Sequence, residues 1–305
     1  MSNPSTILII GGSGFLSGTI ARTAVDAGHE VWTVTRGQRS IPNGVMSLIA
    51  DRRDTTAFQR VIEAANTTWD LVIDCIGFEV SDAEQDMQVF QRLTKQLVFI
   101  STDFVYDPAH RKFPQPEEAD HYLSDGYGGK KRQCELAFLD GDTGDMQWTI
   151  LRPCHIYGPG SQLGCLPLHG RDPQLIQKLR AGETLKLVGG GHFLQQPIFA
   201  PDLARLALSC QGKEQTYGKI FCAAGPDVIE SRAYYQIIAD VLDVSLRVEE
   251  ISVSDHLRAQ PASAPFLCHR IYDLSRLRAA GAKAPDTPIA QGLREHVASC
   301  RSGCA

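Results

Sequence analysis

Short apolar runs alternate with longer amphipathic stretches through the first half of this 305-residue chain. Six runs predict strands that are apolar on both faces, at 6–10, 30–35, 45–49, 71–75, 97–101 and 148–151. Four stretches predict helices between them, at 15–27, 55–65, 81–96 and 127–139. Strands that alternate with helices form parallel sheets, so the pattern predicts an α/β fold with a doubly wound sheet.

Glycines stand where the first predicted strand turns into the first predicted helix. The run Ile-Leu-Ile-Ile at 7–10 leads into Gly-Gly-Ser-Gly-Phe-Leu at 11–16. Gly11 permits a tight turn and Gly14 lets the backbone approach a pyrophosphate, which the free N–H groups of a helix N-terminus also attract. The turn therefore predicts a dinucleotide site, to which Phe15 and Leu16 also belong.

The end of the second predicted strand bears on the choice of cofactor. Thr35 and Arg36 stand where a binder of NAD usually carries an acidic residue. A guanidinium suits a 2′-phosphate, so we expect NADP to be favoured and NAD to be possible, with a plain surface arginine as the alternative. Asp51 follows the third strand and either faces the adenine or caps the next helix.

The residue pattern changes after Arg152, where frequent prolines and glycines predict a long loop. Beyond it we expect helices at 202–210, 231–242 and 288–300 and strands at 220–224 and 246–251. We therefore expect a dinucleotide-binding Rossmann domain at 1–165, with 193–225 returning to it. Residues 166–192 and 226–305 are expected to form a smaller C-terminal α/β substrate-binding region.

Tyr127 and Lys131 lie four residues apart on a predicted helix, and therefore on one face of it. Such spacing is common by chance, so its context matters. The fifth strand ends in Ser101, Thr102 and Asp103, and the carboxyl ends of strands are where a doubly wound sheet presents ligands. We expect Thr102, Tyr127 and Lys131 to share a site; a surface helix beside a core strand is the alternative.

Together these pieces resemble the extended, or atypical extended, short-chain dehydrogenase/reductases of the NAD-dependent epimerase/dehydratase family. The resemblance covers nearly the whole chain and rests on the glycine turn and on the segments 74–77, 101–107, 127–131, 151–160 and 292–294. It implies that the cofactor also contacts Arg52, Cys75, Ile76, Gly77, Lys131, Pro153 and His155.

The resemblance implies hydride transfer between the cofactor and a sugar or sugar-like substrate, by an epimerase or a ketosugar reductase or dehydrogenase. Tyr127 would exchange the proton of a substrate hydroxyl, Lys131 would stabilise the phenolate, and Thr102 would orient the same oxygen. The alternative function is a non-catalytic dinucleotide-sensing or RNA-associated binding protein, which has no need of a proton relay.

Several positions depart from the family pattern. Ser17 stands where the turn usually has its third glycine, and Phe104 replaces the glutamate of 4,6-dehydratases, which disfavours dehydration. Glutamines in 189–198 replace the arginine that commonly binds a diphosphate, which puts a nucleotide-linked substrate in doubt. The expected substrate contacts are Asp103, His155, His192 and Gln196, with Cys165, His169 and Gln195 as weaker candidates; for His155 a structural role is the alternative.

Composition narrows the partners. The net charge is −5 and the basic residues are scattered, so the sequence shows no basic patch of the kind that binds nucleic acid. No apolar stretch approaches the ~20 residues that span a bilayer, and the first residues lack a signal, so we expect a cytoplasmic protein without a membrane partner. The nine cysteines form no CxxC pair and are expected to be mostly buried apolar residues, with no metal site. The resemblance implies a homodimer.

Overall fold

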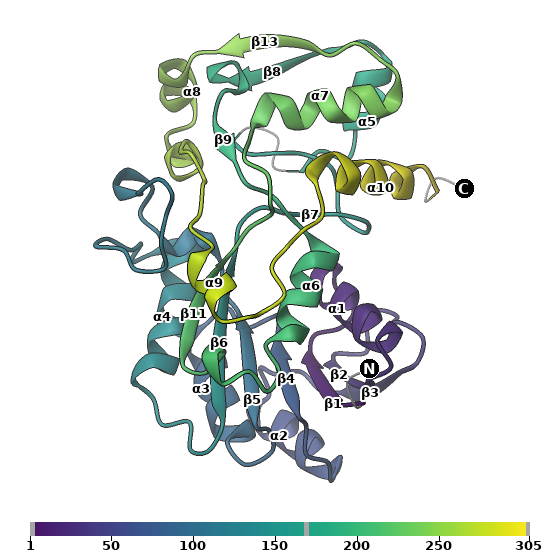
Figure 1. The fold of residues 1–305 in the computed structure, drawn as a ribbon, viewed down its shortest axis with the longest axis vertical. Helices are drawn as coiled ribbons and strands as arrows, with labels where there is room; N and C mark the ends of the chain where they lie inside the picture. Colours follow the sequence, from purple (N-terminus) through teal and green to yellow (C-terminus); the bar gives the residue numbers. More distant parts are fainter. Residues whose placement is uncertain (1–3, 168–170, 303–305) are drawn as a thin grey trace.

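The computed structural model describes residues 4–167 and 171–302, and its centre is a seven-stranded parallel sheet (Figure 1). The strands are β1 (Thr6–Ile10), β2 (Glu30–Thr35), β3 (Val45–Ile49), β4 (Leu71–Asp74), β5 (Gln96–Ile100), β6 (Gln147–Pro153) and β11 (Lys219–Ala223). Their order across the sheet is β11-β6-β5-β4-β1-β2-β3. The Rossmann-type, doubly wound α/β fold expected from the sequence is confirmed.

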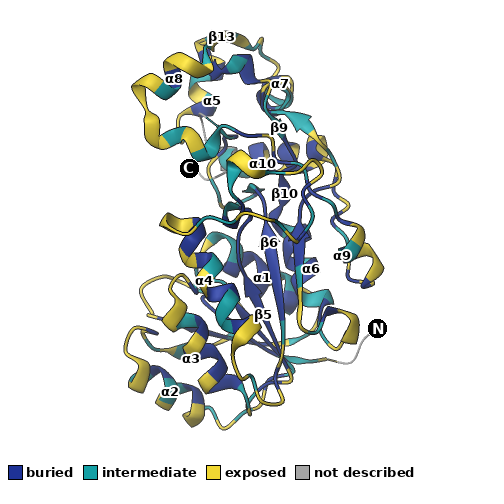
Figure 2. Cartoon of the chain, turned by 90° about the vertical axis from the view of Figure 1, so that its left-hand side faces the viewer, coloured by how far each residue is buried: buried dark blue, intermediate teal, exposed yellow. Residues whose placement is uncertain are grey.

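Helices cover both faces of this sheet. On one face α1 (Phe15–Asp26) packs beside α6 (Ala200–Ser209), and Ile20 and Leu203 share one apolar core. On the other lie α2 (Thr55–Ala64), α3 (Val80–Phe90) and α4 (Gly126–Asp140), over a core that includes Phe58, Phe90 and Phe138. Strand β5 is buried along its whole length between these layers (Figure 2).

The edge strand β3 departs from the expectation that every predicted strand is apolar on both faces. Ile49 is 64% exposed, and no residue of β3 is fully buried. The reason is its position, because β3 has a neighbour on one side only, β2.

The C-terminal part adds a third apolar core, which includes Leu187, Ile238 and Leu293. Its elements are α5 (Leu175–Arg180), β8 (Thr184–Val188), α7 (Ser231–Leu242), β13 (Arg247–Ile251), α8 (Val253–Ala259), α9 (Ser275–Ala279) and α10 (Ile289–Ser302). Strands β8 and β13 pair in parallel above the main sheet (Figure 1). Helix α9 instead packs against β11, so part of the 226–305 segment also reaches the main sheet.

Short strands connect the two parts. Strand β7 (Ile156–Tyr157) pairs with β10 (Ile198–Phe199), and β9 (Leu194–Gln195) pairs with β12 (Ile229–Glu230). The sequence did not predict these strands. One predicted helix is also too long: α3 ends at Phe90 instead of residue 96, since the chain must turn before β5 begins at Gln96. The polar side chain of Gln96 can be buried in the sheet because its amide nitrogen donates hydrogen bonds to the hydroxyl groups of Thr149 and Thr216.

Three further expectations concern no single element of the fold. Of the eight cysteines in the described residues, six are buried, as expected, and two are half-buried; Cys304 lies outside the described residues. Within residues 4–167 and 171–302, no helix is long and apolar enough to span a bilayer. The same residues contain no group of three or more His, Cys, Asp or Glu side chains placed to hold a metal ion.

Candidate active site

The turn between β1 and α1 leaves the backbone open to a ligand. Gly11 and Gly12 have φ angles of +114° and +111°, which L side chains rarely allow. A Cβ on Gly12 would lie 2.3 Å from the methyl carbon of Thr33 on β2, so only glycine fits there. Ser17, which replaces the usual third glycine, accepts a hydrogen bond of 3.1 Å from the N–H of Gly14. Sequence reasoning singled out Gly11 and Gly14 but missed the tighter constraint on Gly12.

A cleft of about 560 Å³ opens beside this turn. Arg36, Arg39 and Arg53 line it, and none of the three forms an ion pair with another described residue. Asp51 lines it as well and accepts a hydrogen bond from the backbone N–H of Arg53. Because Asp54 caps α2 through the N–H of Ala57, the capping role considered for Asp51 is wrong.

Arg52 also lines the cleft and belongs to a buried network of ion pairs. Its guanidinium lies 2.9 Å from Asp74, 2.9 Å from Asp86 and 3.1 Å from Asp82. Burial alone would lower the pKa of Arg52, but the charges of Asp74, Asp86 and Asp82 outweigh it and raise that pKa. Arg52 therefore stays charged, and its charge is already neutralised.

Asp74 also shapes the loop after β4, where Cys75, Ile76 and Gly77 were expected to touch the cofactor. Its Oδ1 accepts hydrogen bonds from the N–H of Ile76 at 2.8 Å and of Gly77 at 3.0 Å. Ile76 lines the cleft, and Cys75 is half-buried. Pro153 lies at the carboxyl end of β6, on the same side of the sheet.

Helix α4 brings Tyr127 and Lys131 to the carboxyl ends of β4 and β5. Tyr127 is 51% exposed, whereas Lys131 is only 2% exposed. The Nζ of Lys131 donates to the carbonyls of Gly77 at 2.5 Å and Ile100 at 2.7 Å. Its ammonium lies 3.9 Å from the ring centre of Phe99. Burial lowers the pKa of this lysine, and the Asp74 charge opposes the shift.

Thr102 lies beside Tyr127 at the end of β5, where η1 (Asp103–Val105) begins. Partial burial raises the pKa of the Tyr127 phenol, and a hydrogen bond with Thr102 acts in the opposite direction. The two hydroxyl groups are close because α4 packs directly against the backbone of the segment that follows Thr102. A Cβ on Gly128 of α4 would lie only 2.0 Å from the carbonyl oxygen of Phe104. The structure thus brings Thr102, Tyr127 and Lys131 together.

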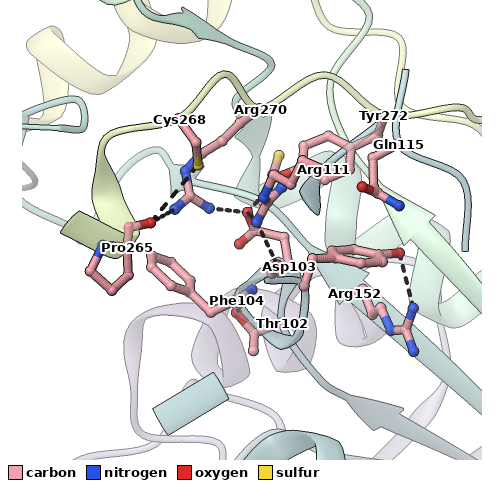
Figure 3. Close-up of polar contacts among 12 residues, drawn as sticks. Thr102, Asp103, Phe104, Arg111, Gln115, Arg152, Pro265, Cys268, Arg270 and Tyr272 are labelled. Atoms are coloured by element: carbon pink, nitrogen blue, oxygen red, sulfur yellow. Dashed lines mark hydrogen bonds and ion pairs between the residues drawn. The ribbon is translucent and has the colours of Figure 1, made fainter. Parts of the chain in front are cut away.

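Asp103 belongs to a separate buried cluster (Figure 3). Its carboxylate contacts the guanidinium of Arg270 and the hydroxyl of Tyr272 and lies 3.3 Å from Arg111. Burial opposes ionisation of Asp103, but the charges of Arg270 and Arg111 outweigh it and lower its pKa. Protein groups therefore already bind the Asp103 carboxylate, which was expected to contact the substrate. Arg111 and Arg270 come from distant loops, and no sequence motif marked them.

The remaining substrate candidates differ in their surroundings. The amide of Gln196 donates to the carbonyl of Gly225 and accepts from the N–H of Tyr272, so both of its polar atoms are already bound within the protein and not by a substrate. His192 is exposed and lies 3.1 Å from Glu230. Cys165 is buried, and His169 lies outside the described residues.

His155 is a half-buried residue where the two parts of the chain meet. Its ring centre lies 6.2 Å from that of Tyr234. Burial, and then the charge of Arg171, lowers the pKa of His155 to about 4, so its ring is neutral at pH 7. Both its proposed substrate contact and a structural role are compatible with a neutral imidazole.

These residues fit a nicotinamide dinucleotide. The Gly11–Gly12 cradle leaves no room for a Cβ, as close approach of a pyrophosphate requires. The adjacent cleft has the volume and the arginines for the adenosine half, and Tyr127 lies beside it, with its ring centre 6.3 Å from that of Phe78 in the cleft lining.

Comparison with known proteins places this geometry in a family. A family model described as the NAD dependent epimerase/dehydratase family matches residues 7–217. The chloroplast stem-loop binding protein of 41 kDa b of Arabidopsis thaliana is 26% identical over 73% of this chain and 60% of its own length. A dTDP-4-dehydro-6-deoxy-D-allose reductase of Streptomyces bikiniensis is 24% identical over 95% of this chain and 94% of its own.

Solved structures show the same fold. The UDP-N-acetylglucosamine 4-epimerase of Methanobrevibacter ruminantium superposes with a TM-score of 0.78 at 18% identity, covering 99% of this chain and all of that one. The UDP-glucose 4-epimerase of Thermotoga maritima gives 0.77 at 17% identity, covering 98% of this chain and all of that one. The chain belongs to the NAD-dependent epimerase/dehydratase family.

Proposed function

We propose that this protein transfers a hydride between NADP(H) and a carbinol or carbonyl carbon of a sugar-like substrate. The observation that carries the proposal is the meeting of the Thr102 and Tyr127 hydroxyl groups one helical turn from the buried Lys131. When bound, a nicotinamide dinucleotide supplies or accepts the hydride. Gly11, Gly14, Phe15 and Leu16 would hold its pyrophosphate, and Asp51 and Ile76 would border its adenosine.

Residues of the chain itself carry out the proton exchange with the substrate oxygen. Tyr127 gives a proton to the substrate oxygen during reduction and takes it back during oxidation. Thr102 hydrogen-bonds the same oxygen and fixes its position. Lys131 favours the phenolate through its nearby charge. An epimerase would use both directions in one turnover, whereas a ketosugar reductase would use only the first.

Replacing Tyr127 by Phe tests this assignment. Tyr127→Phe should lower turnover by at least about 100-fold, the usual contribution of a positioned acid or base, while the Kd for the dinucleotide changes less than about twofold, since Tyr127 does not line the cleft proposed for the adenosine half. Turnover is followed by nicotinamide absorbance or by sugar exchange, and the Kd by calorimetry. Turnover at the wild-type rate would refute the role of Tyr127.

The preference for NADP rests on charge around the adenosine half of the cleft. Arg36, Arg39 and Arg53 line it without an ion-pair partner among the described residues, and guanidinium groups bind phosphate well. Arg36→Asp should weaken NADPH binding at least about tenfold, or 1.4 kcal/mol, and strengthen NADH binding. Calorimetric titration of both variants with both dinucleotides measures the ratio of affinities, and an unchanged ratio would exclude this role for Arg36.

A dinucleotide-sensing or RNA-associated binding protein is the second candidate function. It is favoured by the similarity to a chloroplast protein named for stem-loop binding. Against it stand the net charge of −5 and the close trio of Thr102, Tyr127 and Lys131, which a sensor does not need. Micromolar binding of a stem-loop RNA, unchanged by saturating NADPH, together with no turnover would favour this alternative.

The assembly and location expected from the sequence remain part of the proposal. We propose a homodimer formed through α3 and α4, because Val80 and Leu139 on these helices are 41% and 44% exposed. Light scattering after size exclusion measures the mass, and a 33.4 kDa species would contradict the dimer. We also propose that the protein is cytoplasmic and that residues 166–192 and 226–305 bind the substrate, with His155 and His192 as contacts.

A further inference from the structure

Tyr127 is one member of a row of four aromatic rings. The ring centres of Phe78 and Tyr127 are 6.3 Å apart, those of Tyr127 and Phe104 are 6.2 Å apart, and those of Phe104 and Phe266 are 5.5 Å apart. We call these four residues the aromatic row. Phe78 is 47% exposed and Tyr127 51%, while Phe104 and Phe266 are half-buried. Aromatic surface therefore flanks the proton-exchanging phenol on both sides.

The arginines nearest the row are already bound by protein groups (Figure 3). The guanidinium of Arg270 lies 4.3 Å from the ring centre of Phe104 and donates to Asp103 and to the carbonyl of Pro265. Arg111 donates to the hydroxyl of Tyr272 and to the carbonyl of Asp103. Both arginine side chains are 1% exposed.

The unused donors of these two arginines are buried too. Their Nε atoms have no hydrogen-bond partner among the described residues, and each exposes almost no surface. The two guanidiniums carry one more charge than Asp103 compensates, but a substrate anion would have to enter the packed interior to reach it. A diphosphate beside Tyr127 thus finds no accessible guanidinium in this cluster.

Two lysines beside the aromatic row are also engaged, and one exposed arginine lies at the glycine turn. Lys131 donates to two backbone carbonyls, and the Nζ of Lys130 lies 2.6 Å from Glu79. Arg171 is exposed, but its guanidinium lies 5.8 Å from the ring centre of Phe15 on the glycine turn. Its charge also acts on His155, which the sequence places at the cofactor as well as at the substrate, and we assign Arg171 to the cofactor side of the site.

A surface of this kind suits a neutral ligand. Aromatic rings bind the C–H face of a sugar or an apolar substituent, whereas a diphosphate needs accessible cationic donors. Building on the function proposed above, we propose that the substrate is an uncharged sugar derivative, not a nucleoside diphosphate sugar. Its apolar or aromatic substituent packs on Phe104 and Phe266 while the reacting carbon faces Tyr127.

Calorimetric titration of the NADPH-saturated protein tests the substrate class. The probes are p-nitrophenyl glycosides of the common hexoses, the parent hexoses, UDP and UDP-glucose; saturation with NADPH keeps UDP out of the adenosine cleft. At least one glycoside should bind tenfold or more tightly than its parent hexose. UDP and UDP-glucose should bind no more tightly than glucose.

Variants of the aromatic row locate the contact. Phe266→Ala should weaken the best glycoside roughly 3- to 10-fold, and Phe104→Leu is a second variant with a smaller change in volume. Phe113→Ala is the matched control, since Phe113 is 53% exposed and its ring meets His269, not the row. An unchanged Kd for NADPH shows that each variant is folded.

Two results would overturn the inference. One is micromolar binding of UDP or UDP-glucose to the NADPH-saturated protein, unaffected by Phe266→Ala. The other is a full panel of glycosides that bind no better than their parent hexoses. Either result leaves the proposed hydride transfer intact, because that function is tested separately by Tyr127→Phe.

Discussion

Tyr127 and Lys131 stand one helical turn apart yet meet different surroundings. The phenol is half exposed and its pKa is raised by partial burial, so it is protonated at neutral pH. The lysine is buried, and its ammonium is bound by the carbonyls of Gly77 and Ile100. A protonated phenol that faces outward above a buried cation is ready to give a proton.

His155 gives a pH-dependent test at the same scale. Its pKa is lowered to about 4 by burial and then by Arg171, whereas an unfolded histidine titrates near ~6.5. Between these values the unfolded state binds more protons, so stability is complete above pH 6.5 and falls as the pH drops toward 4.

The variant His155→Asn lacks this titration. Between pH 7 and pH 4.5 the wild type should lose about 1–3 kcal/mol more of its free energy of unfolding than the variant does. Urea denaturation of both proteins at both pH values measures the difference. Equal losses would show that His155 is accessible to protons in the folded protein.

Among the elements, α4 owes its position to two glycines. Cβ atoms on Gly128 and Gly129 would lie 2.0 Å from the carbonyl oxygen of Phe104 and 2.4 Å from the carbonyl carbon of Ser124. The helix therefore rests directly on the backbone of the segments before it, which sets the depth of Tyr127. Paired glycines inside a predicted helix were the available signal for this close approach.

Gly128→Ala tests the depth of α4. Alanine normally stabilises a helix relative to glycine by up to ~1 kcal/mol, but here its Cβ must push α4 away from Phe104. We expect a net loss of about 1–3 kcal/mol in the free energy of unfolding and a loss of turnover, as Tyr127 moves from Thr102. Lys130→Ala on the same helix, where Glu79 is the exposed ion-pair partner, should cost under about 1 kcal/mol. A stabilised, active Gly128→Ala variant would contradict the close packing.

Elements set by local pattern were predicted well, and elements set by distant pairing were not. The bounds of β1, β2, β3 and α7 agree with the sequence, because hydrophobic alternation and turn residues act within a few positions. The two-residue strands β7, β9, β10 and β12 exist only through partners far along the chain. The same holds for the site. The spacing of Tyr127 and Lys131 is a local signal and could be predicted, whereas the arginines that pair with Asp103 come from distant loops and could not.

At the scale of the molecule, buried carboxylates anchor the C-terminal chain to the main sheet. Asp103, just beyond β5, binds Arg270 and Tyr272, while Asp202 on α6 accepts from the N–H and the hydroxyl of Thr287. Both acids lie on elements of the main sheet and its helices, and their partners come from the segment after α8. These polar contacts thus add to the apolar contacts of Tyr272, Leu274 and Leu277, which share the core of the main sheet.

Asp103→Asn tests this anchoring without a change of volume. The asparagine leaves Arg111 and Arg270 buried without a counter-charge, which should cost about 3–5 kcal/mol of unfolding free energy. Asp107→Asn, at a carboxylate paired with the half-exposed His110, is the matched control and should cost under about 1 kcal/mol. Hydrogen exchange in residues 265–272 should rise in Asp103→Asn, while the affinity for NADPH stays unchanged, because the adenosine cleft is lined by the glycine turn, the end of β2, the loop after β3 and α3 and does not include Asp103. A loss no larger than that of Asp107→Asn would mean that Asp103 is not an anchor and is free to meet the substrate.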